Sequence, residues 1–213
     1  TVILKADGTV WGWGLSYQGQ LGTGYSNSFE YFPTQMKKES NGACLENIIE
    51  IVAGGLFTLA LDTNGQVWAT GQNTSGQLRN GTTESSLTAF QVLKEDGTPL
   101  DNICDLAAGY NHSLAETRDE TVMIWGNNEC GQLGDGQESG LMSLYPIPVM
   151  KGPGEEVGDN VAVVVANANR SFAILNDGTF FVWGSNLNSG LETVPTGSES
   201  LYPEGIDFDL FVL

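Results

Sequence analysis

Short apolar runs alternate with clusters of Gly, Asn and Asp along the whole chain. In one representative stretch, the apolar runs lie near residues 48–53, 57–62, 66–70 and 89–93. The runs are continuously apolar or have a period of two, and turn-forming residues bound them, as is typical of β-strands. No long stretch has the period of an amphipathic helix. The pattern therefore predicts an all-β protein.

The pattern of strands and turns returns four times along the chain. Each copy closes on a glycine, at positions 14, 71, 126 and 184, so the spacings are 57, 55 and 58 residues. A fixed period of this length is typical of repeat proteins. We therefore expect a single repeat domain over residues 1–213. Its repeats should lie at approximately 1–44 (truncated at its start), 45–99, 100–157 and 158–213.

A Trp-Gly step, or a variant of it, ends each copy. The residues concerned are Trp13 and Gly14, Trp68 and Gly71, Trp125 and Gly126, and Trp183 and Gly184. An Asp-Gly or Asn-Gly pair such as Asn64-Gly65 comes before most of these steps and predicts a tight hairpin turn. Four short antiparallel strands per repeat form one blade of a β-propeller. We expect the indole to wedge between neighbouring blades and the glycine to let two backbones approach closely.

Further blocks accompany the Trp-Gly step, most completely in the third repeat. They are Gly-Tyr-Asn-His-Ser-Leu-Ala at residues 109–115, Trp-Gly-Asn-Asn at 125–128 and Gly-Gln-Leu-Gly-Asp-Gly at 131–136. Taken together, these blocks resemble the regulator-of-chromosome-condensation repeat, and the resemblance covers essentially the whole chain. The resemblance implies β-propeller blades that belong to a larger, seven-bladed ring.

The number of repeats departs from that family, because the chain has about four and the first begins inside the motif. Three arrangements stay open: a part of a longer ring, a ring closed by a partner chain, or an unusually small ring. We favour the first. Open blades would leave unpaired strand edges, so we expect missing residues or a second subunit to complete the ring. The stretch 208–213 could supply the inner strand that the first repeat lacks.

The chain is strongly acidic, with 26 Asp and Glu residues against 8 Lys and Arg residues and a formal net charge of −18. This balance argues against binding to nucleic acid and to an anionic membrane surface, because both need basic side chains. The three cysteines, Cys44, Cys104 and Cys130, lack the spacing of a zinc or redox site. We expect free thiols in a reducing compartment, which favours the cytoplasm. Cys104 aligns with Ile49 and is expected to be buried and unreactive.

The sequence contains no motif that indicates a catalytic, cofactor-binding or metal-binding site. His112 is the only histidine, and no His or Cys lies near it at the spacing of a metal site. Phe57 and Arg170 take its place in other repeats, so its role is expected to be structural. A phosphate-binding glycine loop and a Gly-x-Ser-x-Gly elbow are both missing. We therefore expect no enzyme, no cofactor and no metal.

The function predicted from these observations is a non-enzymatic protein-binding propeller that serves as a scaffold or regulator. Two alternatives remain. Resemblance to the founding member of the family implies a guanine-nucleotide exchange factor for a small GTPase, although no repeat has the insertion that this activity needs. Bacterial relatives imply a secreted enzyme inhibitor.

The binding face is expected at the end of the blades that carries the first and third connections of each repeat. Large side chains in these connections differ between repeats, whereas the second connection is a tight turn with little contact area. Binding energy at interfaces concentrates in Tyr, Trp and Arg. The candidate contact residues are Tyr17, Tyr110, Asn111, His112 and Arg170.

Overall fold

The computed structural model describes most of the chain. The described residues are 1–25, 29–39, 41–79, 81–137, 140, 142–152, 155–156, 160–186 and 199–206. The stretch 208–213, which could have supplied an inner strand to the first repeat, lies outside the described residues. Within the described part, every regular element is a β-strand, and no helix is long and apolar enough to cross a membrane.

Four antiparallel sheets follow one another along the chain, and we number them blades 1 to 4. Blade 1 contains β1 (Val2–Leu4), β2 (Val10–Leu15) and β3 (Phe29–Gln35). Blade 2 contains β4 (Ile48–Ala53), β5 (Phe57–Asp62), β6 (Val67–Gly71) and β7 (Ser86–Gln91). Blade 3 contains β8 (Ile103–Ala108), β9 (His112–Thr117), β10 (Val122–Gly126) and β11 (Ser143–Pro148). Blade 4 contains β14 (Val161–Asn167), β15 (Arg170–Leu175), β16 (Phe180–Ser185) and β17 (Glu199–Ile206).

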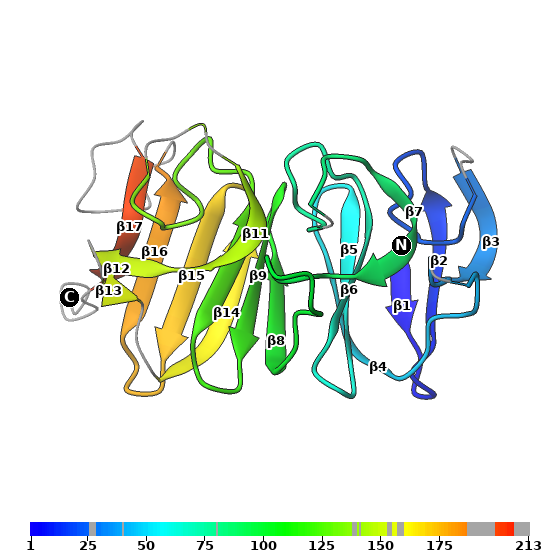
Figure 1. The fold of residues 1–213 in the computed structure, drawn as a ribbon, viewed down its shortest axis with the longest axis horizontal. Coiled ribbons are helices and arrows are strands. Elements are labelled where there is room, and N and C mark those ends of the chain that lie inside the picture. The colour runs from blue at the N-terminus through cyan, green and yellow to red at the C-terminus, as the bar shows by residue number, and fades with distance from the viewer. Residues whose placement is uncertain are drawn as a thin grey trace, which may run out of the picture.

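The blades stand side by side in chain order, as Figure 1 shows. The tight turns between β1 and β2 of blade 1, and between the second and third strands of blades 2 to 4, all lie at one end of the sheets, which we call the turn end. The connections between the first and second strands of blades 2 to 4, between the third and fourth strands of blades 2 and 3, and between β2 and β3 of blade 1 lie at the opposite end, which we call the loop end. A short hairpin of β12 (Met150–Gly152) and β13 (Glu155–Glu156) connects blade 3 to blade 4 in the chain and lies beside β17. The prediction of an all-β chain built from four-stranded propeller blades is confirmed.

Turn chemistry sets the hairpins at the turn end. Gly65 has a φ of 75°, so a glycine is favoured at this second turn position. In blade 3 the equivalent residue is Glu120, which adopts a φ of 64° despite its side chain. The hairpin register is kept in both blades, because β5 pairs with β6 and β9 with β10 without a shift.

The apolar core lies between neighbouring blades rather than within one sheet. One cluster joins Phe57 and Leu59 of blade 2 to Leu106 and Trp125 of blade 3. A second cluster joins blade 3 to blade 4 and includes Trp183. Each large apolar side chain that is fully buried contributes about 1.5–3 kcal/mol of stability. Packing between blades therefore holds the sheets together.

The innermost strands carry a bulge that corrects the prediction for Cys104. Ile103 pairs with Thr117 and Asp105 pairs with Glu116, so Cys104 is left over in the bulge. As a result its side chain is exposed, and the expectation that it is buried is wrong. Partial burial of the sulfur, followed by the nearby charge of Glu116, raises the pKa of the Cys104 thiol to about 11. This shift disfavours the reactive thiolate.

Candidate functional site

The Gly-Gln-Leu loops at the loop end bind each blade to the next. The backbone carbonyl of Gln77 in blade 2 accepts hydrogen bonds from Ser113 Oγ at 2.9 Å and from Trp125 Nε1 at 2.8 Å, both in blade 3. The same arrangement recurs one junction later. There the carbonyl of Gln132 accepts from Ser171 Oγ at 2.8 Å and from Trp183 Nε1 at 2.9 Å. One main-chain oxygen thus fixes two strands of the following blade.

The side chains of these loops hold the carbonyl in place. Gln132 Oε1 accepts a hydrogen bond from the Cys130 amide at 2.8 Å, and Asn128 Oδ1 accepts from the Leu133 amide at 3.0 Å. Asn73 and Gln77 make the corresponding bonds in blade 2. These local hydrogen bonds fix the Gln and Leu residues of each loop at the loop end.

The junction between blades 1 and 2 uses two threonines, Thr58 in place of the serine and Thr70 in place of the tryptophan. Thr58 Oγ1 donates to the Gln20 carbonyl at 2.8 Å, and Thr70 Oγ1 donates to the Gly19 carbonyl at 2.9 Å. Trp68 lies two residues before Thr70 and is half-buried. Its indole Nε1 donates to Asp62 Oδ2 at 3.0 Å within the same blade. Trp68 therefore does not occupy the position between blades that Trp125 and Trp183 fill.

The glycine of the Trp-Gly step allows a close backbone approach. Gly14, Gly71, Gly126 and Gly184 all have a φ between 99° and 112°. A Cβ added at Gly126 would lie 2.6 Å from the Asn111 carbonyl oxygen, and one at Gly71 would lie 2.5 Å from that of Leu56. Only glycine accommodates both the positive φ and the contact.

His112 is enclosed between blades 3 and 4, so the expectation that it contacts a partner is wrong. Its side chain has no exposed surface. Nε2 lies 2.9 Å from Ser171 Oγ, which donates its hydrogen to the Gln132 carbonyl. The hydroxyl must therefore accept from Nε2–H, which leaves Nδ1 unprotonated and without a partner. Burial lowers the pKa of His112 to about 4, so the ring is neutral.

The remaining candidate residues lie at the loop end with different degrees of exposure. Tyr17 and Tyr110 expose 49% and 57% of their surface, whereas Asn111 and Arg170 are half-buried. Arg170 Nε donates to the Ser185 carbonyl at 2.6 Å. Asn111 Oδ1 accepts from the side-chain amide of Gln77 at 3.3 Å. The two tyrosines therefore offer the largest accessible side chains of the set.

Neighbouring blades hold the backbone of Tyr110. Its amide donates to the Ala168 carbonyl of blade 4 at 2.7 Å, and its carbonyl accepts from the Gly55 amide of blade 2 at 3.1 Å. The first connections of three successive blades are thus tied into a continuous rim. We call this set of connections the loop rim; it comprises residues 54–56, 109–111 and 168–169.

Carboxylates meet between the innermost strands of blades 2 and 3. Burial, and then the neighbouring Asp105 carboxylate, raise the pKa of Glu50 to about 7. Burial and Asp105 also raise the pKa of Glu116. Asp105 is in turn hydrogen-bonded to its neighbour blade, since Oδ2 accepts from the Val164 amide at 3.5 Å. Among the described residues, no group of His, Cys, Asp and Glu is arranged to hold a metal ion.

The repeat sequence matches a known family description. The description "Regulator of chromosome condensation (RCC1) repeat" matches residues 7–61 and 64–115. A second description of the same repeat matches residues 48–77 and 103–132.

Similar proteins include members with different overall functions. The chain is 30% identical over 194 residues to the probable E3 ubiquitin-protein ligase HERC6 of Homo sapiens, covering 89% of this chain and 18% of the relative. It is 28% identical over 198 residues to the secretion-regulating guanine nucleotide exchange factor of Bos taurus, covering 90% and 40%. The crystal structure of Kap60 bound to yeast RCC1 (Prp20) matches with a TM-score of 0.75 and 21% identity, covering 97% of this chain and 46% of that chain. The chain spans less than half the length of each of these proteins.

Proposed function

Because this chain belongs to the regulator of chromosome condensation (RCC1) repeat family, we propose that it is a non-enzymatic propeller that binds a protein partner at its loop end. The observation that carries the proposal is the loop rim, where Tyr110 is exposed while its backbone is fixed by both neighbouring blades. A side chain presented from a backbone that is already fixed reduces the entropy lost on binding, because the main chain does not have to be ordered. Tyrosine is also among the residues that dominate interface energetics.

The docking surface that we propose is smaller than the set expected from the sequence. It contains Tyr17, Tyr110 and the exposed part of Arg170. His112 is excluded by its burial, and Asn111 contributes at most its accessible edge. The relative in the solved complex supports a protein partner in general, because yeast RCC1 is bound to Kap60 there.

Alanine substitutions at the loop end test this surface. The full-length protein is used to capture its partners, and the captured proteins are compared between the original sequence and a Tyr17→Ala/Tyr110→Ala double variant. We expect the double variant to lose a captured protein, because truncation of a hot-spot tyrosine costs about 2 kcal/mol or more of binding energy. Tyr25→Ala is the matched control, since Tyr25 is 47% exposed but lies against Lys37. Unchanged capture by the folded double variant contradicts the proposed surface.

A guanine-nucleotide exchange factor is the second candidate, and the bovine relative favours it. One observation counts against exchange activity: each of the three connections between blades folds back on itself in a local antiparallel pairing. Residues 37 and 44 pair in the first connection, residues 93 and 99 in the second, and β12 with β13 in the third. None of the three therefore stands out as an added wedge among the described residues. Nucleotide release from a panel of small GTPases separates the two candidates. Accelerated nucleotide release from one GTPase would establish exchange activity. Release at the intrinsic rate from every GTPase would favour the non-enzymatic binding propeller.

A further inference from the structure

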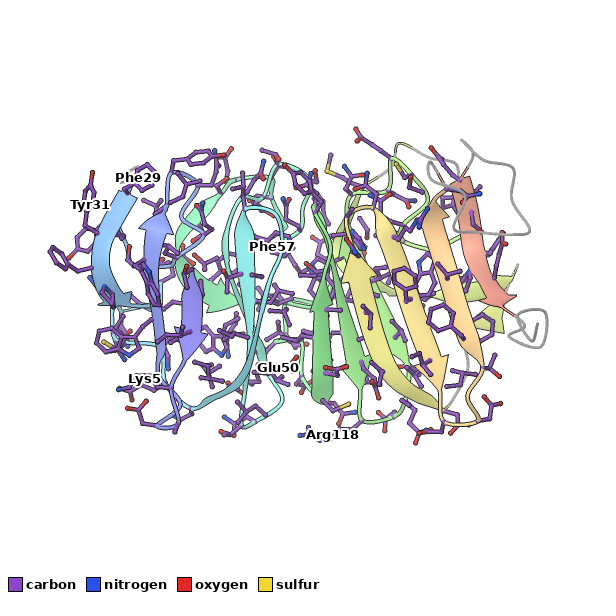
Figure 2. The ribbon with its side chains drawn as sticks, turned by 180° about the vertical axis from the view of Figure 1, so that it is seen from behind. Lys5, Phe29, Tyr31, Glu50, Phe57 and Arg118 are labelled. Carbon is purple, nitrogen blue, oxygen red and sulfur yellow. The ribbon has the colours of Figure 1, made fainter. Side chains whose placement is uncertain are left out.

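A pocket of about 310 Å³ lies at the turn end, between blade 3 and the connection that leads to it from blade 2. Leu100, Met123 and Pro146 supply apolar surface to it. The charged side chains that line it are the carboxylates of Glu95, Asp101 and Asp119 and the ammonium of Lys94. Arg118, which follows Thr117 of the pocket wall, is visible at the lower edge of the molecule in Figure 2. The pocket is therefore at the opposite end of the blades from the loop rim.

The same position at the preceding junction already contains a lysine. Met123 lies three residues before the closing glycine of blade 3, as Trp68 does in blade 2. The ammonium of Lys38, from the connection between blades 1 and 2, lies over the Trp68 ring at 5.1 Å from its centroid. This position in the repeat thus accommodates an alkylammonium group against the side chain of the third strand.

The second junction has an equivalent lysine, but that lysine turns elsewhere. In both connections the lysine directly follows a residue that forms a β-bridge. Lys38 follows Lys37, which pairs with Cys44, and Lys94 follows Leu93, which pairs with Pro99. Instead of covering Met123, Lys94 pairs with Asp101 at 2.5 Å. A methionine attracts a cation less than an indole does, because it has no aromatic face. The space above Met123 stays open as a result.

We propose that this pocket binds the side chain of a lysine presented by a protein partner. The four methylene groups pack on Leu100, Met123 and Pro146. The ammonium binds the second oxygen of each neighbouring carboxylate, Asp101 Oδ2 and Asp119 Oδ1, because Asp101 Oδ1 is bound by Lys94 and Asp119 Oδ2 by Asn102. Lysine matches this lining because its stem is apolar while its head is a compact charge. The net charge of −18 attracts a basic partner to the whole surface, and the pocket gives that attraction a defined position.

This inference changes the view of the turn end. The sequence predicts that the tight turns there offer little contact area. The turn after β9 is indeed short, yet it forms one wall of the pocket together with the connection from blade 2 to blade 3. A second binding position, separate from the loop rim, follows from this arrangement.

Methionine methyl signals provide a direct test. The chain has four methionines, so carbon-13 labelling of their methyl groups gives few signals. Met123 lines the pocket, whereas Met36 is 1% exposed and serves as an internal reference. The probe is the capped peptide Gly-Gly-Lys-Gly-Gly, titrated into the folded protein. We expect a saturable shift of the Met123 signal with Met36 unchanged, and a much weaker effect from the same peptide with norleucine in place of lysine.

Variants separate the pocket from general electrostatic attraction. Asp101→Asn/Asp119→Asn should weaken lysine-peptide binding about fivefold, as expected when a surface ion pair of ordinary strength is lost. Glu46→Gln is the control, because Glu46 holds the position of Asp101 in the preceding repeat and does not line the pocket. It should leave the affinity unchanged.

A third variant restores the first junction's arrangement. Met123→Trp should draw Lys94 over the new indole and abolish peptide binding, followed through the amide signal of Asn102, which also lines the pocket. The proposal is overturned if the Met123 signal does not move, if norleucine and lysine peptides act equally, or if the Glu46→Gln variant loses as much affinity as the Asp101→Asn/Asp119→Asn variant.

Discussion

At the scale of single residues, backbone crowding at the Trp-Gly step is the most demanding feature of the repeat. Gly126 has a φ of 105°, and an added Cβ would lie 2.6 Å from the Asn111 carbonyl oxygen. Gly97 has a comparable φ of 81°, but no atom would lie within 4 Å of its Cβ. Both glycines therefore have a positive φ, but only Gly126 is crowded by a neighbouring backbone atom.

Gly126→Ala should destabilise the protein by about 3 kcal/mol, because strain and crowding add. Gly97→Ala should cost only about 1 kcal/mol, which is the penalty of the positive φ alone. Urea unfolding of both variants measures the difference. Equal losses would contradict the close contact between the backbones of Gly126 and Asn111 within blade 3.

The single histidine makes stability depend on pH. The pKa of His112 falls from an ordinary 6.5 to about 4 in the folded state, because burial disfavours the charged ring. The unfolded chain therefore binds a proton that the folded protein rejects between these two values. Stability is full above pH 6.5 and decreases as the pH falls toward 4, by up to about 3 kcal/mol from this residue.

His112→Phe should remove that part of the pH dependence, since Phe57 occupies the same repeat position in blade 2 and is also buried. Thermal unfolding at a series of pH values, with the original protein as reference, provides the measurement. A pH profile that is identical in the two proteins would contradict the buried, neutral state of the ring.

At the scale of the elements, acidic side chains on neighbouring inner strands oppose each other. The pKa of Glu50 on β4 is raised from 4.5 to about 7 by burial and by Asp105 on β8. The folded protein therefore retains a proton between these values that the unfolded chain releases. Stability falls as the pH rises through this window and remains lower above pH 7.

Glu50→Gln should raise the stability above pH 7 by about 1 kcal/mol, a figure that allows for solvent screening of this half-exposed group. Below pH 4.5 the substitution should have little effect. Glu46→Gln changes the net charge equally and is the control in the same unfolding measurement. A stabilisation that persists unchanged at low pH would contradict the charge repulsion between the strands.

The strands could be predicted well from the sequence, because their apolar period and the Asn-Gly turns are local signals. The predicted strands at 48–53 and 57–62 coincide with β4 and β5. The exposure of Cys104 could not be predicted, because a bulge shifts the alternation of faces by one residue without a local signal. The last strand of the repeat starts earlier than expected, at Ser86 rather than near 89.

The contacts at the loop end could be predicted only in part. The Gly-Gln-Leu blocks are visible as a pattern, but their main contact with the next blade uses the carbonyl of Gln77, a group that every residue has. The burial of His112 depends on Ser171 of the following blade, and the sequence does not pair these two residues. Contacts between repeats are therefore the part that sequence reading alone leaves open.

At the scale of the whole molecule, blade 1 presents an aromatic surface at the end of the row of blades (Figure 2). Tyr31 and Phe32 of β3 are 84% and 80% exposed. In blade 2, the residue that is equivalent to Tyr31 by strand register is Leu87. The backbone of Leu87 packs against Gly19 of the preceding blade. We propose that Tyr31 and Phe32 likewise pack against the glycine loop of a further blade, as in a larger ring.

The 213-residue chain on its own should therefore self-associate through this surface, since large exposed apolar patches favour association. Light scattering is the measurement. Tyr31→Ser/Phe32→Ser should reduce the associated fraction, and Tyr25→Ser is the control at another exposed tyrosine. A monomeric chain with a cooperative thermal transition would contradict the need for a further blade.

The central claim is that a protein partner docks on the loop rim. Photo-crosslinking tests it most directly, with p-benzoylphenylalanine in place of Tyr110 in the full-length protein inside its own cells. The residue is exposed and its backbone is tied to both neighbouring blades, so the probe should report only molecules that reach the rim. We predict a discrete cross-linked protein from position 110 and a much weaker product from Tyr25, the exposed tyrosine beside Lys37. Cross-links from position 25 with none from position 110 would contradict the account.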